Sequence, residues 1–423
     1  MVDQATATSA KPTGSDNALV AFIPRVNIQA FCDDQRTAEA MQAAATDRRM
    51  TRAHVSIQLG GIKAAAQLYQ SNATPDVLLV ETKGARDVIV SQLMELAAVC
   101  QPDTKVIVIG HVNDVTLYRE LIKQGVSEYM VAPLHQLQII ETIAGLYSDP
   151  RAAPVGKVIA FIGAKGGVGS STIAHNVAWL MANRYATETV IVDFDLAYGT
   201  AGLNFNQEST SGMLDAIAQP ERLDATLIDR LLTKLGDKLS LLSGPGGVDR
   251  DIVIETRAVE AILAAVRSSI PNVVLDLPNL WTPWVKFALL QADKVVITAT
   301  PDLASLRNTK NFFDMLKQSR PNDALPLIVL NQFGVPKRPE IPADEFGKAI
   351  GTEIACVIPL DPFTFGTAQS NGQMLFEIAA KSKAADALTR LAQMITGTER
   401  LTLAPKSGLS SVFSKLLMGG KKK

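Results

Sequence analysis

The sequence predicts two α/β domains in series, each built on a parallel sheet with helices on both faces. Three observations support this. Short apolar runs alternate with helix-period stretches from Ala18 to about Thr396, a proline-containing break interrupts them at 148–154, and a glycine-rich loop follows the break between a strand and a helix. Because parallel strands need crossover connections, such alternation predicts doubly wound sheets.

Length and composition exclude several protein classes. The chain has 423 residues and a net charge of -1, so two or three domains and no overall attraction to nucleic acid are expected. Its cysteines (Cys32, Cys100 and Cys356) and its histidines are scattered, which predicts neither a disulfide framework nor a metal cluster. Without a signal-peptide pattern or an apolar run of about 20 residues, we expect a cytoplasmic protein.

The first predicted domain covers residues 18–148 and follows a leader at 1–17 whose composition predicts disorder. Five apolar runs are its predicted strands: Val26–Phe31, His54–Leu59, Val77–Val80, Lys105–Ile109 and Glu128–Val131. The intervening stretches carry apolar residues at helical spacing: Ala38–Ala45, Ile62–Tyr69, Val88–Val99, Val115–Lys123 and Gln136–Leu146.

The second predicted domain covers residues 157–397, between a linker at 149–156 and a tail at 398–423. Seven apolar runs are its predicted strands: Val158–Ile162, Val190–Val192, Leu239–Leu242, Val273–Leu275, Lys294–Thr298, Leu327–Leu330 and Ile354–Val357. This domain holds the motifs that predict a ligand.

The first motif is a glycine-rich loop between the strand Val158–Ile162 and a helical stretch at Ile173–Asn183. Strand, glycine loop and helix form the context of a phosphate-binding loop, where backbone N–H groups face the anion and a hydroxyl binds Mg²⁺. Ser171 or Thr172 would provide that hydroxyl. The candidate nucleotide-binding residues are Lys165, Gly166, Gly167, Val168, Gly169, Ser170, Ser171 and Thr172.

The loop resembles the deviant Walker A motif K-G-G-x-G-K-[ST] of the ParA/MinD superfamily. The resemblance implies a P-loop ATPase domain that binds ATP and Mg²⁺, with Ser171 as metal ligand. It also implies a homodimer in which Lys165, in a catalytic role, reaches the partner's nucleotide. Ser170 departs from the motif, where a lysine is usual. Because a serine cannot place a charge between the phosphates, we expect weak or absent hydrolysis.

Two acidic motifs follow in the order that this superfamily uses. Asp193 and Asp195 end the run Val190–Val192, and on a strand their spacing would put both carboxylates on one face. By resemblance, Asp195 orients the attacking water as a catalytic residue, while Asp193 supports the metal site. Asp276 follows Val273–Leu275 as in a Walker B motif and would hold Mg²⁺ through a water.

Two later positions resemble the superfamily's base-contact region. Asn331 ends the run Leu327–Leu330, and the resemblance implies that it recognises adenine. Pro359 belongs to a stretch similar to the loop that lies along the base. Taken alone, Asn331 reads equally well as a strand-end turn residue.

The first domain resembles a response-regulator receiver domain with its chemistry removed. Glu81 stands where the resemblance places the phosphorylated aspartate, Ala132 where it places the lysine, and Gly110 where it places a Thr or Ser. Phosphotransfer is therefore expected to be lost, and a docking or dimerisation module is favoured. We expect Glu81 to be a solvated carboxylate at a strand end, and the alternative is a mimic of the phosphorylated state.

The tail is basic and amphipathic, since its apolar residues recur at helical spacing between lysines. The stretch Leu409–Lys423 is a candidate for peripheral contact with an anionic membrane. Docking on a partner or on the chain's own core are the alternatives.

A degenerate receiver followed by a deviant ParA/MinD ATPase resembles the TadZ/CpaE proteins of Flp (Tad) pilus assembly. The similarity extends from about Ala18 to Thr396 and is most specific at Gly163–Leu180, serine at the lysine position included. It implies an ATP-binding, dimerising factor that localises the pilus secretion machinery to a cell pole, at the inner membrane, with that machinery or polar landmark proteins as partners.

Other classes remain as alternatives. An active ParA/MinD-like ATPase could position DNA or a membrane-associated complex, but the balanced charge and the receiver-like domain disfavour DNA partition. A nitrogenase-reductase-like enzyme needs cluster-binding cysteines, and none lies between Gly169 and Ala355.

Overall fold

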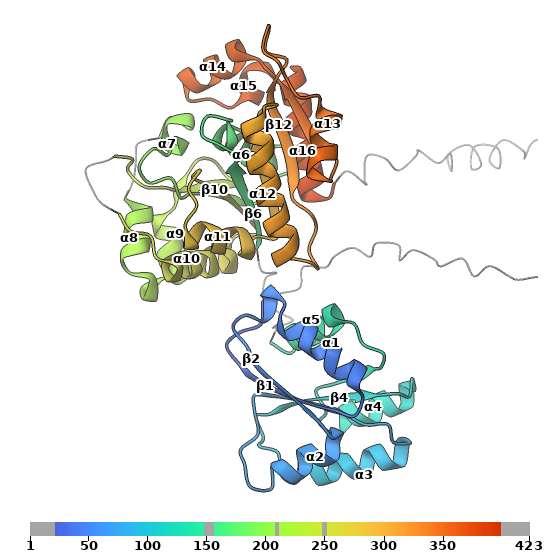
Figure 1. Cartoon of the computed structure of the whole chain (residues 1–423). Coiled ribbons are helices and arrows are strands. Elements are labelled where there is room, and N and C mark those ends of the chain that lie inside the picture. Colours follow the sequence, from blue (N-terminus) through green and yellow to red (C-terminus); the bar gives the residue numbers. More distant parts are fainter. Residues whose placement is uncertain (1–21, 148–155, 208–210, 248–251, 399–423) are drawn as a thin grey trace, which may run out of the picture. The chain divides into compact units, whose positions relative to one another are not determined.

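The computed structural model describes residues 22–147, 156–207, 211–247 and 252–398. The predicted leader, most of the predicted linker and nearly all of the predicted tail, including the candidate membrane stretch Leu409–Lys423, lie outside the described residues. The chain divides into two compact units, Met1–Ala152 and Ala153–Lys423, which we describe separately (Figure 1).

The first unit is a five-stranded parallel sheet with the strand order β2-β1-β3-β4-β5. Its strands are β1 Asn27–Cys32, β2 His54–Leu59, β3 Val77–Glu81, β4 Lys105–Gly110 and β5 Glu128–Val131. Its helices are α1 Gln35–Ala45, α2 Gly61–Leu68, α3 Arg86–Ala97, α4 Val115–Lys123 and α5 Gln136–Gly145, with a 3₁₀ turn at Arg48–Met50. The predicted α/β class and all ten predicted elements are confirmed, with small differences at the ends.

Helices cover both faces of this sheet. Apolar residues of α1 and α5 pack on one face, and those of α2, α3 and α4 pack on the other. The central strand β3 is buried at every position, so it reads as a continuous apolar run that ends in a carboxylate, Glu81.

The second unit is an eight-stranded sheet with the order β13-β12-β11-β6-β10-β7-β9-β8, parallel except for β8 against β9. Its strands are β6 Lys157–Gly163, β7 Thr189–Asp193, β8 Thr233–Lys234, β9 Leu239–Leu242, β10 Asn272–Leu277, β11 Lys294–Ala299, β12 Leu327–Phe333 and β13 Ile354–Pro359. The seven predicted strands are present, and the two-residue β8 was not predicted because it is too short for a period-2 pattern.

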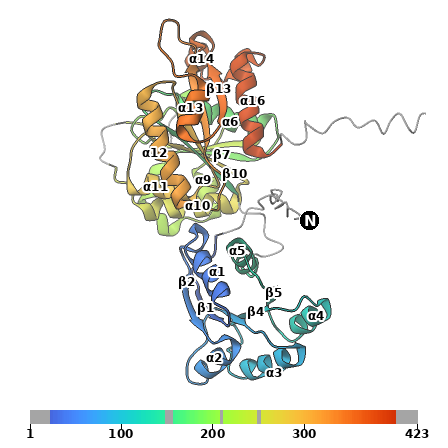
Figure 2. The ribbon, with the colours of Figure 1, turned by 45° about the vertical axis from the view of Figure 1, so that its right-hand side comes forward.

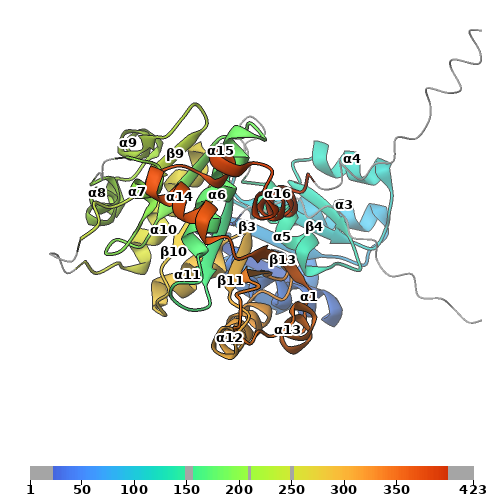
Figure 3. The same ribbon diagram turned by 90° about the horizontal axis from the view of Figure 1, so that it is seen from above.

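Helices lie on both faces of the second sheet as well (Figures 2 and 3). One face is covered by α6 Ser170–Asn183, α7 Ala201–Asn204, α15 Leu375–Ala379 and α16 Lys383–Thr396. The other is covered by α8 Gly212–Ala218, α9 Ala225–Leu231, α10 Thr256–Ser269, α11 Pro283–Gln291, α12 Leu303–Ser319 and α13 Ala343–Ile350. The helix α14 Pro362–Asn371 packs against α15 and α7.

The strand order places the carboxyl end of β6 at the point where ligands of such sheets usually bind. β6 lies between β10 and β11, where the strand order reverses relative to the sequence. Ligands of open α/β sheets bind outside the carboxyl ends of the strands at such a switch point. The glycine-rich loop leaves β6 at this end, so the fold places the loop where sheets of this kind bind their ligands.

Among the described helices, none combines the length and the apolarity needed to cross a bilayer.

Candidate functional site

The glycine-rich loop connects β6 to α6 through a turn that depends on glycine. Gly167 has φ 78° and Gly169 has φ 85°, both in the left-handed region that favours glycine. Helix α6 begins at Ser170, three residues before the predicted start at Ile173. The first turn of the helix is therefore formed by the hydroxyl residues themselves, which places their amides at the positive end of the helix dipole.

The backbone N–H groups and the backbone carbonyl groups of the loop differ in their hydrogen bonding. Within the described part of the chain, the backbone N–H groups of residues 165–172 donate no hydrogen bond. Four loop carbonyls each accept a hydrogen bond from a side-chain amide at 2.7–3.0 Å: Gly163 from Asn279, Ala164 from Asn308, Gly167 from Gln332 and Val168 from Asn331. Because four of its carbonyl groups accept hydrogen bonds while the N–H groups of residues 165–172 donate none among the described residues, the loop can offer these N–H groups to an anion such as phosphate.

Ser170 differs chemically from the lysine that its position usually holds. Its side chain is buried, and its Oγ has no hydrogen-bond partner among the described residues. Ser171 and Thr172 are partly exposed in the same helical turn. The hydroxyl groups of Ser170, Ser171 and Thr172, next to the loop N–H groups, are suitable for binding a nucleotide with its Mg²⁺. Because Ser170 is neutral, this position would contribute no positive charge to stabilise the phosphates during hydrolysis.

Lys165 has an internal partner that the sequence did not indicate. Its Nζ lies 2.8 Å from Oδ2 of Asp302, the N-cap residue of α12, which also accepts hydrogen bonds from Thr300 and Ser305. Partial burial works against the ionised carboxyl, but these three donors prevail and lower the pKa of Asp302 to about 2. The Lys165 side chain is still 40% exposed, so it is held at the surface by a carboxylate rather than buried.

The two acidic residues of the first motif do not share a strand face, so that prediction is wrong. β7 ends at Asp193, whose Oδ1 accepts a hydrogen bond from the backbone N–H of Asp195. This Asx turn redirects the chain after the strand. Asp193 is buried, while Asp195 is partly exposed and accepts from the backbone N–H of Tyr198.

The structure does bring Asp193 beside Asp276. The two are paired across neighbouring strands, because β10 runs parallel to β7 in a register that places Asp276 opposite Asp193. Burial, reinforced by the charge of Asp276, raises the pKa of Asp193 to about 7. Asp276 lies within β10, which continues to Leu277. Two buried carboxylates at one sheet edge form a candidate site for the hard cation Mg²⁺.

His175 completes this acidic pair and was missed from the sequence. It lies on α6, is fully buried, and its Nε2 approaches Oδ2 of Asp276 to 3.3 Å. The available signal was a polar residue inside the apolar helical stretch Ile173–Asn183, but no spacing rule connects that position to Asp276.

The two candidate base-contact residues, Asn331 and Pro359, lie on the neighbouring strands β12 and β13. Asn331 lies inside β12, is buried, and donates its amide to the carbonyl of Val168 at 2.8 Å. The alternative reading of Asn331 as a strand-end turn residue is therefore wrong. Pro359 ends β13, which pairs with β12 near Phe333. Adenine recognition by Asn331 and Pro359 stays a prediction.

A hollow of about 380 Å³ borders the start of the loop. Its apolar wall includes Trp281, which is 56% exposed and contacts the ring of Phe312 with a centroid distance of 5.5 Å. Leu280 beside it is 58% exposed. Side chains of this size are rarely left uncovered together, so this face is a candidate for covering by a partner.

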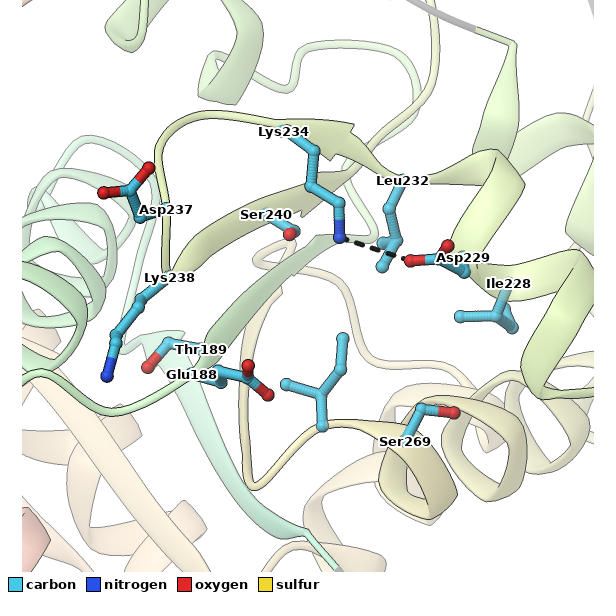
Figure 4. Close-up of a pocket in the computed structure, with 11 residues that line it drawn as sticks. Glu188, Thr189, Ile228, Asp229, Leu232, Lys234, Asp237, Lys238, Ser240 and Ser269 are labelled. Atoms are coloured by element: carbon cyan, nitrogen blue, oxygen red, sulfur yellow. Dashed lines mark hydrogen bonds and ion pairs between the residues drawn. The ribbon is translucent and has the colours of Figure 1, made fainter.

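A second hollow of about 200 Å³ lies at the amino ends of the strands, away from the loop (Figure 4). Lys234 points toward Asp229, with a distance of 3.2 Å between Nζ and Oδ1, and Glu188, Asp237 and Lys238 also line the hollow. Cations and carboxylates alternate there, so the hollow offers no concentrated charge for an anion such as phosphate.

The expectation that Glu81 is a solvated carboxylate is wrong. Its side chain is 0% exposed and accepts from the backbone N–H groups of Asp33 and Asp34, at 2.7 and 2.9 Å. The hydroxyl of Thr37 and Nε2 of His111 approach its other oxygen, both at 2.9 Å. The longer side chain of glutamate, compared with aspartate, carries the carboxylate to the residues that directly follow β1, where backbone N–H groups bind it in place of solvent.

The position of Gly110 also has a physical reason. A Cβ on this residue would collide with the ring and hydroxyl of Tyr129, whose hydroxyl donates to the carbonyl of Val112. The tyrosine therefore fills the space that a Thr or Ser would need.

We expect Glu81→Ala to lower the free energy of unfolding of the first unit by about 3 kcal/mol or more, because each buried donor left unpaired costs about 1–3 kcal/mol. Hydrogen exchange of the β3 amides in the full chain measures this loss. The three tryptophans, Trp179, Trp281 and Trp284, all lie in the second unit, so their fluorescence serves as an internal control. The exposed Glu95→Ala is the matched variant, and equal protection in both would contradict the assigned role.

Comparisons with known proteins agree with this fold. A family model described as an AAA domain matches residues 156–325. The septum site-determining protein MinD of Helicobacter pylori is 25% identical over 258 residues, covering 57% of this chain and 91% of that protein. The structure of MinD from Pyrococcus horikoshii complexed with Mg-ADP covers 57% of this chain and 96% of that chain at 20% identity with a TM-score of 0.50, a likeness of fold.

The first unit has a separate relative. A crystal structure of the pilus assembly protein CpaE from Caulobacter crescentus covers 30% of this chain and 98% of that chain, with 46% identity and a TM-score of 0.30. The match falls on the N-terminal region, and the sequence identity is the basis for the assignment. With this region in front of a MinD-like AAA domain, the chain belongs to the CpaE family of ParA/MinD-type ATPases.

Proposed function

We propose that this protein binds ATP with Mg²⁺, dimerises through the nucleotide-binding face, and serves as an assembly factor that directs a pilus secretion machinery to a cell pole. One observation carries the proposal: a glycine-rich loop whose backbone N–H groups at residues 165–172 donate no hydrogen bond to any described residue and which lacks the usual lysine, in a chain whose N-terminal region is 46% identical to a CpaE pilus assembly protein. The loop supports nucleotide binding, and the N-terminal relative supports the pilus assignment.

At the loop, the amides of residues 165–172 hold the phosphates, and the hydroxyl of Ser171 is the direct metal ligand. Asp276 holds the same ion through a water, while Asp193 supports the site from the neighbouring strand. Mg²⁺ neutralises charge on the phosphates when it is bound. Asp195 is the residue that orients water, since its partly exposed carboxylate follows the strand end.

Dimerisation uses Lys165 together with the apolar hollow that Leu280 and Trp281 line with Ala164, the residue before the lysine. The lysine is held at the surface, and the two large apolar side chains of the hollow are more than half exposed in the single chain. A second copy of the chain would cover the apolar surface and offer phosphate oxygens to Lys165. The driving force is burial of apolar area, with the lysine contact making the association dependent on ATP.

Hydrolysis is weak because the position nearest the phosphates carries the neutral Ser170. The bound nucleotide therefore acts as a persistent signal for the dimer, as suits a localisation factor. The proposal includes a peripheral position at the cytoplasmic side of the inner membrane.

The test is genetic and uses the source bacterium. A strain in which the chromosomal copy carries Lys165→Ala should lose most surface pili, and a fluorescent fusion of that variant should spread from the pole through the cell. Lys348→Ala, at an exposed lysine of α13, is the control and should behave as wild type. Normal pilus numbers in a strain that lacks the whole chain would reject the pilus assignment, whatever the nucleotide chemistry.

A further inference from the structure

The imidazole of His175 is a buried polar group that the proposed nucleotide site does not yet account for. It is fully buried on α6, five residues after Ser170, and Nε2 has no hydrogen-bond partner among the described residues. Burying a polar ring without satisfying it is costly, so such a group needs a reason.

The ring is oriented from its other side. Nδ1 lies 2.9 Å from the side-chain amide Nδ2 of Asn204, the last residue of α7, which also contacts the hydroxyl of Thr200 at 3.3 Å. Since an amide nitrogen can only donate, Nδ1 of the imidazole is the acceptor and the ring proton belongs on Nε2. The proton therefore faces Oδ2 of Asp276 at 3.3 Å.

This approach is the only ion-pair contact of Asp276 among the described residues. At 3.3 Å the contact is an electrostatic one, just short of an aligned hydrogen bond. Such donors are often long before a ligand is bound and shorten once it is. His175 thus stands directly behind a carboxylate of the proposed metal site.

Both carboxylates of the site hold α7. Asp193 Oδ2 accepts from the backbone N–H of Ala201, the first residue of the helix, at 3.4 Å. Asp276 is linked to the last residue through His175 and Asn204. The short helix is therefore tied at both ends to the residues that would meet Mg²⁺, and its neighbour α14 packs directly against it.

We propose that His175 is a positioning residue that fixes Asp276 for Mg²⁺ and, through Asn204, couples metal-nucleotide loading to the position of α7. The inference rests on the proposed function, since it assumes Mg²⁺ and ATP at the loop. A side chain that donates a hydrogen bond to a metal-binding carboxylate orients that carboxylate and contributes about 10–100-fold to metal affinity.

The experiment measures ATP affinity by titration with and without Mg²⁺, using His175→Leu, His175→Gln and Asn204→Ala. We expect His175→Leu to keep the affinity for metal-free ATP, which the loop amides provide. The increase in ATP affinity on adding Mg²⁺ should be about 10–100-fold smaller in this variant than in wild type. His175→Gln retains a donor and should recover most of the gain. Asn204→Ala removes the partner that orients the ring and should lose part of it.

A second measurement follows α7 directly. Hydrogen exchange of the α7 amides should slow on addition of Mg²⁺ and ATP in wild type and in His175→Gln, and should not respond in His175→Leu. Asn176→Leu is the matched control, because this residue is equally buried on α6 but bonds to Leu375 and Thr172 instead of the carboxylates. It should lower thermal stability without changing the Mg²⁺ dependence.

The possible outcomes separate the two proposals. Wild type that binds no nucleotide under any condition contradicts the proposed function, and this inference with it. Wild type that gains affinity with Mg²⁺ while His175→Leu and Asn204→Ala gain equally contradicts the inference alone. If His175→Leu does not fold, the Asn204→Ala titration and its α7 exchange decide the question.

Discussion

Lys165→Ala should strongly weaken ATP-dependent dimerisation while leaving most of the affinity for ATP. The loop amides of the same chain hold the nucleotide, whereas the lysine lies at the rim with 40% of its side chain exposed. A charge-assisted contact contributes about 1.5–3 kcal/mol, and a two-fold dimer uses it twice. The dimer should therefore weaken by about 3–6 kcal/mol, which is two to four orders of magnitude in the dissociation constant.

The partner of the lysine provides a variant that acts in the opposite direction. Asp302 holds Lys165 at 2.8 Å in the single chain, and this contact must be released before the lysine reaches another subunit. Asp302→Asn removes the charge but keeps a side chain that caps α12 equally well. We expect this variant to dimerise more readily with ATP than wild type.

Sedimentation velocity with and without ATP measures these effects. Lys348→Ala, which removes an exposed charge from α13, is the control and should match wild type. The same dimer affinity for wild type and Lys165→Ala in every condition would remove the role assigned to the lysine. A weaker dimer for Asp302→Asn would show that the ion pair supports the interface instead of competing with it.

Much of the fold could be predicted because it depends on local patterns. The continuous apolar strands of both sheets, with β3 and β7 buried at every position, are typical of parallel sheets covered on both faces. The glycine-rich loop was identifiable for the same reason, since the positive φ angles at Gly167 and Gly169 require glycine.

The contacts that shape the site could not be predicted, because they join distant parts of the chain. The ion pair between Lys165 and Asp302 spans 137 residues, and the amide of Asn331 reaches the loop across 163. Strand spacing also misled at Asp195, since an Asx turn at Asp193 ends the strand first. No sequence rule states when a side chain will end a strand by bonding its own backbone.

The contacts of Glu81 in the first unit could not be predicted for the same reason. A carboxylate at a strand end is usually solvated, and only the folded chain reveals that the amides of Asp33 and Asp34 enclose it. The burial of Glu81 follows from the parallel pairing of β1 with β3, which brings its carboxylate to the backbone N–H groups that directly follow β1, 47 and 48 residues earlier in the chain.

Ser170→Lys should raise the turnover of ATP by about 10–100-fold, the equivalent of about 1.5–3 kcal/mol for one charge-assisted contact. The substituted position is the first residue of α6, in the loop whose N–H groups are candidates for phosphate binding, and the Oγ of Ser170 has no hydrogen-bond partner in the part of the chain that the structure describes. A lysine there would bring an ammonium group to oxygens whose charge increases in the transition state, so the gain should appear in kcat more than in affinity.

Length and charge must be separated in that experiment, because Ser170 is buried and any longer side chain disturbs the loop. Ser170→Met adds comparable length without charge and should not gain turnover. Without nucleotide, the lysine variant should unfold at a lower temperature than wild type, since its ammonium lies near the positive end of α6. No gain from the lysine would mean that the serine is not what limits hydrolysis. The cause would then lie with the turn at Asp193, which directs the backbone of Asp195 away from the strand.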